Sequence, residues 1–228
     1  MTGWLLAIDT ATDALSVAIG KDGVPVFAGW QRRRKGHAEE LAPLIDRTLR
    51  TADLSPGHLE AIAVTVGPGT FTGVRIGLAA ARGMRIALKI PVVGLNTLEL
   101  LAFQAGRRWP ERPVMAALDA RRGQVYAQYF GDMTGAWPSP WSAPAAMPAA
   151  QAAGMLVGDS ILCGSGAGLI ADAATQDKVR KAAPILPDAG AILELLADRP
   201  IPAASMPPPS PLYLRAPDAI PAKPVLNL

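Results

Sequence analysis

A glycine-rich turn between a strand-like run and a helix-like run most constrains how this chain can fold. The run Ala61–Val66 is rich in β-branched residues, and the letters GPGTFTG follow it at positions 67–73. Glycine adopts positive φ without a Cβ clash and proline fixes its own φ, so the chain can reverse sharply before Thr70 or Thr72 caps a helix. The turn therefore predicts a strand, a tight reversal and a helix in direct succession.

The backbone N–H groups of this turn form a candidate phosphate site, because free amides and the positive end of a helix both favour an anion. The segment lacks the lysine and the spacing of a G-x-x-x-x-G-K-[ST] loop, and it lacks the spacing of G-x-G-x-x-G. A turn that only shapes the backbone is therefore the competing interpretation.

The helix after the turn is apolar around most of its circumference, with Arg75 and Arg82 marking the polar side. Such a helix needs more than one packing neighbour, so we expect a close helix–helix contact within the protein or with a partner. The alternative is that the small residues pack on the helix's own sheet. The narrow small-residue face holds Gly73, Gly77, Ala80 and Met84, and the adjoining stripe holds Val74, Leu78, Ala81 and Leu88.

Composition predicts a soluble globular protein. Half of the 228 residues are hydrophobic, yet no apolar run approaches the roughly 18 residues that a membrane span needs. The first residues lead directly into a strand, so we expect no signal peptide. The single cysteine, Cys163, cannot form an internal disulfide or a cysteine metal cluster, which favours the cytoplasm and a buried structural role.

Basic residues cluster locally, whereas the net charge is only +3. The densest cluster is Arg32-Arg33-Arg34-Lys35, and two arginine pairs stand at 107–108 and 121–122. We consider a direct RNA contact through Arg32, Arg33, Arg34 and Lys35 as a hypothesis, with a solvated basic surface as the alternative.

The order of elements over the first hundred residues is β-β-β-α-β-α-β-α. Three strands joined by a tight Asp22-Gly23 turn precede a helix in which Leu41, Leu44, Ile45, Thr48 and Leu49 repeat at helical spacing. Parallel strands with crossover helices follow. This is the layout of a ribonuclease-H-like or actin-like half domain. Because proline disrupts a helix interior, we expect the first helix to kink at Pro43 or to begin near Glu40.

A second, less regular region follows, so we expect two lobes, residues 1–106 and 107–228, with the second reduced. A hairpin is predicted from Val114–Asp119 and Gln124–Phe130, and a helix from Ala189–Ala197. Residues 131–160 are rich in Ala, Pro and Gly and show little periodicity. The recurring prolines of 200–211 predict an extended tail that Tyr213 and Leu214 anchor.

Five motifs together resemble the TsaB (YeaZ) family. They are DTAT at 9–12, HAEELAP at 37–43, GPGTFTGVRIG at 67–77, DARRG at 119–123 and PLYLR at 211–215. The resemblance implies an α/β, actin-like fold of two ribonuclease-H-like lobes. It also implies a role in synthesis of threonylcarbamoyladenosine, next to the anticodon of tRNAs that read codons starting with A.

The resemblance further implies a non-catalytic partner that binds the catalytic paralogue TsaD and the ATPase TsaE, and that meets tRNA indirectly through the complex. The first two helices of the first lobe would bind TsaD, and a homodimer would use the same face. The interface residues expected on this basis are His37, Leu41, Leu44, Ile45, Thr70, Phe71, Gly73, Val74, Gly77, Ala80, Ala81 and Met84.

Two enzymatic alternatives stay open. A metallopeptidase is disfavoured because the metal-binding H-x-x-x-H of the catalytic paralogue reads His37 followed by Leu41 here, and His58 lies outside this helix. An actin-like ATPase or kinase would place Asp9 near a nucleotide, with Asp119 and the glycines of 164–168 opposite. Gln124 stands where the family pattern has a glutamate. We expect no cofactor, no metal and no catalytic residue, and we keep Asp9 as a possible nucleotide contact.

Overall fold

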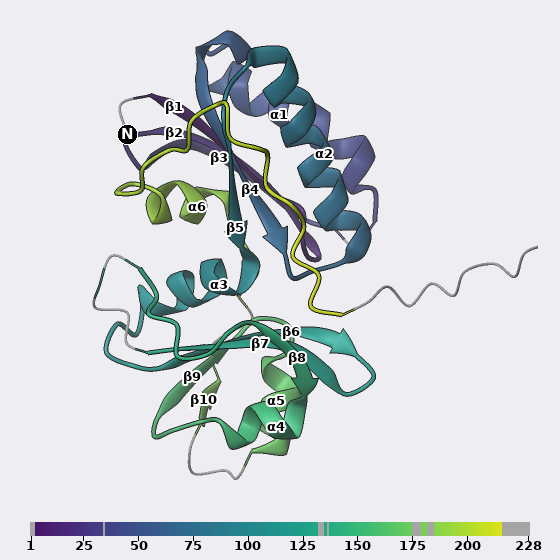
Figure 1. Cartoon of the computed structure of the whole chain (residues 1–228), viewed down its shortest axis with the longest axis vertical. Coiled ribbons are helices and arrows are strands. Elements are labelled where there is room, and N and C mark those ends of the chain that lie inside the picture. The colour runs from purple at the N-terminus through teal and green to yellow at the C-terminus, as the bar shows by residue number, and fades with distance from the viewer. Residues whose placement is uncertain are drawn as a thin grey trace, which may run out of the picture.

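The structure is a computed structural model that describes residues 3–33, 35–131, 135, 137–174, 179–181 and 185–215. Arg34, one of the residues considered for RNA contact, lies outside this range. The described chain forms two sheets, one above the other in Figure 1, with helices on their faces and between them.

The first sheet combines an antiparallel meander with two parallel strands. Its strands are β1 (Trp4–Asp9), β2 (Ala14–Lys21), β3 (Val24–Arg32), β4 (Leu59–Gly67) and β5 (Val92–Asn96). They lie in the order β3-β2-β1-β4-β5, with β1 antiparallel to β2 and parallel to β4. Apolar side chains of β1, β2 and β4 are buried on both faces, as expected for central strands covered by helices.

The second sheet repeats this order. Its strands are β6 (Val114–Arg121), β7 (Gln124–Phe130), β8 (Ala145–Pro148), β9 (Ser160–Cys163) and β10 (Val179–Lys181). They lie in the order β8-β7-β6-β9-β10, with β6 antiparallel to β7 and parallel to β9. The predicted fold class is confirmed, and the reduction of the second lobe takes the form of short strands within a complete strand order.

Two long helices cover one face of the first sheet. They are α1 (His37–Thr51) and α2 (Phe71–Leu88), and the short 3-10 helix η1 (Pro56–His58) precedes β4. The first helix runs from His37 through Pro43, so the expected start near Glu40 is wrong. Leu41, Leu44 and Leu49 bury its apolar stripe in the same core as β1, β2 and β4.

The opposite side of the first sheet faces α3 (Thr97–Gly106) and α6 (Ala189–Leu195). Buried side chains of α6 share a core with Leu5, Ala7 and Ala18 of the first sheet. Leu98 and Leu101 of α3 share another core with the second sheet, so α3 lies between the two sheets (Figure 1). The boundary at residues 106 and 107 stays a proposal, but the chain does return to the first sheet after β10. The second sheet carries α4 (Ala149–Gly154) and α5 (Ala167–Ala173).

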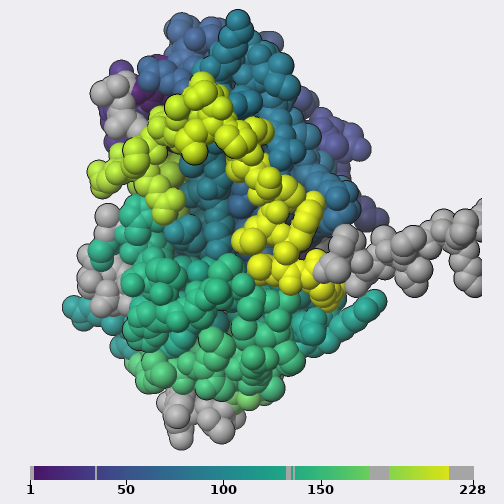
Figure 2. All heavy atoms as spheres, viewed as in Figure 1, coloured from purple at the N-terminus to yellow at the C-terminus, as the bar shows by residue number. Residues whose placement is uncertain are grey.

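The extended segment 200–215 crosses α2 and reaches the second lobe (Figure 2). Arg82 Nη2 donates to the Pro209 carbonyl at 2.8 Å, and Leu212 N donates to the Val66 carbonyl at 2.7 Å. At its end, the Arg215 guanidinium donates to the Ala120 carbonyl at 3.2 Å. The segment therefore contacts α2 on its polar side, which Arg82 marks.

Candidate functional site

The glycine-rich turn docks on the loop that follows β1. Gly67 has φ of 106°, the Gly67–Pro68 peptide is cis, and a Cβ on Gly69 would lie 2.2 Å from the Ala11 carbonyl oxygen. Thr70 N donates to the Ala11 carbonyl at 2.7 Å, and the Thr70 hydroxyl accepts from Gly73 N at 3.1 Å. Thr70 is therefore the cap of α2, and two amides of the candidate phosphate cradle are already bonded within the protein.

The small-residue face of α2 turns toward the protein interior at Gly73 and Gly77. A Cβ on Gly73 would lie 2.1 Å from the Thr10 carbonyl oxygen, and one on Gly77 would lie 2.5 Å from Thr10 Oγ1 and 3.3 Å from Val64 Cγ2. Thr10 Oγ1 also donates to the Gly73 carbonyl at 2.7 Å. The expectation that Gly73 and Gly77 face a partner is corrected, because these two glycines let α2 approach the end of β1.

Three other residues expected at the interface are also buried inside the first lobe. They are Leu44, Val74 and Ala81, with exposed fractions of 1%, 2% and 0%. Leu44 packs under Gly29 of β3, so its contacts are those of core. These three side chains stabilise the lobe itself and do not offer surface to another chain.

An apolar groove instead opens between α1 and α2. It encloses about 700 Å³ and includes four of the residues expected at a partner interface, Leu41, Ile45, Ala80 and Met84. Lining residues that were not expected at the interface include Ala38, Ala42, Ile76, Ala79, Gly83 and Ala87. These residues repeat at helical spacing in the sequence, but the predicted interface centred on the neighbouring face of α2, which holds Gly73 and Gly77.

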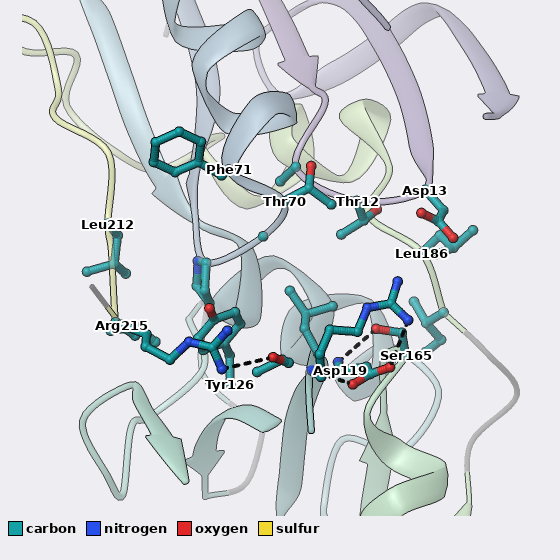
Figure 3. A pocket seen from close by; sticks show the side chains of 18 of the residues that line it. Thr12, Asp13, Thr70, Phe71, Asp119, Tyr126, Ser165, Leu186, Leu212 and Arg215 are labelled. Carbon is teal, nitrogen blue, oxygen red and sulfur yellow. Dashed lines mark hydrogen bonds and ion pairs between the residues drawn. The ribbon is translucent and has the colours of Figure 1, made fainter. Parts of the chain in front are cut away.

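A second hollow separates the two lobes. This interlobe cleft encloses about 1120 Å³. In Figure 3, Thr12, Asp13 and Thr70 approach it from the first lobe, and Asp119, Tyr126 and Ser165 approach it from the second. Further lining comes from Leu212, Tyr213 and Arg215 of the extended segment and from Trp30 and Arg32 of β3.

Aromatic and cationic side chains meet beside this cleft. Phe71 stacks on Tyr213 with ring centroids 5.5 Å apart, and the Arg75 guanidinium carbon lies 3.5 Å from the Phe71 centroid. Arg75 Nε also donates to the Tyr213 hydroxyl at 2.8 Å. Thr70 and Phe71, both expected at the helical interface, therefore lie at the cleft.

Asp9 lies beneath the cleft and is not among the residues that line it. Its carboxylate is fully buried, and Oδ1 accepts from the Thr65 hydroxyl at 2.6 Å and from Ala11 N at 3.4 Å, while Oδ2 has no hydrogen-bond partner among the described residues. Burial raises the pKa of Asp9 from 3.8 to about 6. This placement gives Asp9 no open path to a nucleotide in the cleft.

The other basic residues considered for RNA contact differ in their surroundings. Arg32 is exposed and lines the cleft, and Lys35 is exposed beyond it. Arg33 forms an ion pair with Glu40 at 3.3 Å. The cleft thus includes one member of the basic run, and the run continues outward from it.

The buried cysteine and the helices add two negative results. Burial raises the pKa of Cys163 to about 12, and its thiol donates to the Leu101 carbonyl at 3.6 Å, as expected for a structural residue. Within the described ranges, no group of three or more His, Cys, Asp and Glu side chains has metal-binding geometry. None of the described helices combines the length and apolar character needed to cross a bilayer.

Comparison with solved structures identifies the family. The structure of YeaZ from Pseudomonas aeruginosa superposes with a TM-score of 0.81 and 31% identity, over 93% of this chain and 100% of that one. This chain belongs to the TsaB (YeaZ) family. The expectation drawn from the five motifs is thereby confirmed.

Sequence comparison places the strongest similarity to the TsaB family in part of the chain. TsaB of Escherichia coli (strain K12) is 41% identical over 134 residues, which are 58% of each protein. TsaB of Bacillus subtilis (strain 168) is 35% identical over 122 residues, 54% of this chain and 52% of that protein. The matches thus span little more than half the length of these relatives. The model of the TsaD family, tRNA N6-adenosine threonylcarbamoyltransferase, matches residues 31–135.

In this TsaB-family chain, the histidine at the start of α1 has a structural environment. His37 is 8% exposed, and its Nε2 lies 3.1 Å from the Thr12 carbonyl oxygen and 3.3 Å from that of Ala14. Leu41 occupies the position one helical turn later and is 3% exposed. The imidazole therefore ties α1 to the loop between β1 and β2, which also corrects its expected place at an exposed partner interface.

Proposed function

We propose that this chain acts in biosynthesis of threonylcarbamoyladenosine in tRNA as a non-catalytic scaffold that binds a TsaD-like subunit through the groove between α1 and α2. Relatives named for this pathway and the match to the TsaD family model support the pathway. The scaffold role and the binding partner are inferences from the shape of the chain.

The observation that carries the proposal is the open apolar groove. Ala42, Ala79 and Ala87 are exposed on facing helices, while Ile45 and Met84 lie deeper between them. Burying such a strip against another apolar helix releases water and contributes about 25 cal/mol for each Å² covered. Small exposed residues also let the backbone of a second helix approach closely, as in helix-in-groove recognition.

A non-catalytic role is supported by how the residues of the enzymatic alternatives are used. His37 bonds to backbone carbonyls and has Leu41 in place of a second imidazole. Asp9 bonds to Thr65 beneath the cleft. In this proposal the TsaD-like subunit supplies the catalytic groups, and this chain stabilises its active arrangement.

Gly83 offers a test because a Cβ there meets nothing within 4 Å and the position lies in the groove. Gly83→Arg should leave the monomer folded, since arginine has a higher helix propensity than glycine. It should weaken assembly with the TsaD-like subunit at least tenfold in size-exclusion chromatography with light scattering. Gly154→Arg, in α4 and equally open, is the matched control.

Undiminished assembly of folded Gly83→Arg would reject the groove as the TsaD-binding surface. The same experiment tests self-association. If a homodimer forms through this groove, Gly83→Arg should be monomeric. The unmodified homodimer should also dissociate and form the complex with the TsaD-like subunit when the two proteins are mixed. Binding of a TsaE-like ATPase, indirect contact with tRNA and a cytoplasmic location complete the proposal.

A further inference from the structure

The interlobe cleft gathers arginines and exposed aromatic rings from segments far apart in the chain. Arg32 comes from β3, Arg121 from the end of β6, and Arg215 from the extended segment. Trp30 and Tyr213 line the same cleft with exposed fractions of 45% and 41%. The Trp30 ring, exposed inside a cleft, offers a stacking surface to a ligand.

The cleft residues on β3 have the spacing of a paired contact. Trp30 and Arg32 are two residues apart on an edge strand, so both side chains project from the same face, about 6–7 Å apart. A planar ring beside a guanidinium provides a stacking surface next to a phosphate contact. The Arg121 side chain, on the opposite lobe, is 79% exposed.

Three aspartates line the cleft beside the arginines, and Asp119 Oδ2 lies 3.6 Å from Arg121 Nη1, so Arg32 carries the cationic contact in this inference. Asp119 Oδ1 accepts from Arg121 N at 2.7 Å, and Asp188 Oδ1 accepts from Gly190 N at 2.8 Å at the start of α6. Asp13 also interacts within the protein. Two of these carboxylates thus serve as local caps of the turn after β6 and of α6.

We propose that the interlobe cleft binds a single-stranded segment of RNA, with a base stacked on Trp30 and the adjoining phosphate held by Arg32. Trp30 and Arg32 offer one stacking surface and one phosphate contact side by side, which is the repeating element of single-strand recognition and favours a strand over a mononucleotide. Lys35, three residues after Arg32, is also exposed. This goes beyond the scaffold role, in which tRNA contacts the chain only indirectly, and it does not depend on that role.

The test measures fluorescence anisotropy of a short fluorescein-labelled oligoadenylate with the full chain at about 50 mM and about 200 mM salt. Trp30→Ala should weaken binding about tenfold or more, as expected for loss of one stacking surface. Arg32→Gln should reduce the slope of log K against log salt by about 0.7, the value for one phosphate contact on a single strand.

Two matched controls separate the cleft from general effects of charge and exposed rings. Trp141→Ala removes a tryptophan that is 56% exposed in the second lobe, and Arg108→Gln removes an exposed charge outside the cleft. Both should bind the oligonucleotide as the unmodified chain does. A labelled RNA duplex of equal length should bind at least tenfold more weakly, and unlabelled AMP should compete only at far higher concentration.

Several results would overturn the inference. They are no binding by the unmodified chain, equal losses in the controls, equal affinity for the duplex, or AMP competing as well as the oligonucleotide. Assembly with the TsaD-like subunit is measured for Trp30→Ala and Arg32→Gln in parallel and should be unchanged. If these two variants lose assembly and the unmodified chain does not bind RNA, the cleft binds a protein partner. Trp30→Ala and Arg32→Gln should lose RNA binding and keep assembly, whereas Gly83→Arg should lose assembly and keep RNA binding. This pair of results would support the two proposals separately.

Discussion

The two lobes share one strand order but differ in their helices. Between the third and fourth strands of its sheet the first lobe has α1 with 15 residues, whereas the second has α4 with 6. Between the fourth and fifth strands the lengths are 18 residues in α2 and 7 in α5. The same strand order therefore carries two long helices with a groove between them in the first lobe, and only two short helices in the second.

The turns that close each lobe also correspond. In the first lobe a Cβ on Gly69 would meet the Ala11 carbonyl oxygen, and in the second a Cβ on Gly164 would meet that of Ala117, both at 2.2 Å. Both turns therefore press a glycine against the segment at the end of the lobe's first strand. The carboxylates near the ends of the two first strands differ: Asp9 of β1 is buried, whereas the side chain of Asp119 of β6 is 32% exposed. The shared strand order is therefore accompanied by corresponding glycine turns, whereas the burial of the carboxylate differs between the lobes.

The largest expected effect comes from filling a tight approach in the first lobe. Gly73→Ala would place a methyl group against the Thr10 carbonyl, which is backbone and cannot move aside cheaply. We expect the free energy of unfolding to fall by about 3 kcal/mol or more, measured by urea denaturation. Gly83→Ala, on the open side of the same helix, should instead stabilise by about 0.5–1 kcal/mol. Similar destabilisation by both variants would contradict the inward orientation of Gly73.

The next effect tests the difference between the two carboxylates. The raised pKa of Asp9 means that the native state binds more protons than the unfolded state between pH 3.8 and about 6. Its contribution to stability therefore falls as the pH rises through this range and stays unfavourable above it. Asp9→Asn should stabilise the protein at pH 7.5 by about 2–3 kcal/mol and remove this pH dependence. Asp119→Asn, at the corresponding exposed site, is the control; a stability profile unchanged by Asp9→Asn would show that its carboxylate is not desolvated.

A smaller effect concerns the cap of α2, which has no side-chain counterpart in α5. Thr70→Ala removes the acceptor for Gly73 N and should destabilise the protein by about 1 kcal/mol in urea denaturation. Thr72→Ala removes an exposed hydroxyl from the second residue of the same helix and should have little effect. Equal losses would show that both threonines contribute to the helix start.

The smallest effect concerns the extended segment, which crosses α2. Arg85 Nη2 donates to the carbonyls of Ala204 and Met206, both at 2.8 Å. Arg85→Gln should cost about 1 kcal/mol or less in global stability and speed hydrogen exchange of 200–212. Arg47→Gln, exposed on α1, is the control and should leave that exchange unchanged.

Much of the first lobe could be predicted because its signals are local. Alternating and β-branched runs, the Asp22-Gly23 turn and the glycine-rich turn each specify one step of the path, and the strand order follows from them. Residues 131–160 gave no comparable signal, because alanine, proline and glycine carry little periodicity. The short strands β8 and β10 depend on tertiary pairing with β7 and β9 and could not be read locally.

The sequence placed the proposed interface on α1 and α2, and the structure turns two of its glycines toward the protein interior. Gly73 and Gly77 are small because α2 lies close to Thr10, and a sequence pattern cannot tell a close approach within a lobe from one between chains. Gly83 carries the same side chain with open space around it. The cleft depends on residues from β3, from the end of β6 and from the extended segment, whose proximity only the folded chain shows.

The return of α6 to the first sheet makes the second sheet an insertion within the first lobe. The backbone passes from one lobe to the other after α3 and comes back before α6, so two covalent connections join them at separate points. A body held at two points rotates most easily about the line through them. Any relative rotation of the lobes would have to satisfy both connections at once, and the hydrogen bond from Arg215 to the Ala120 carbonyl adds a third, non-covalent link between them.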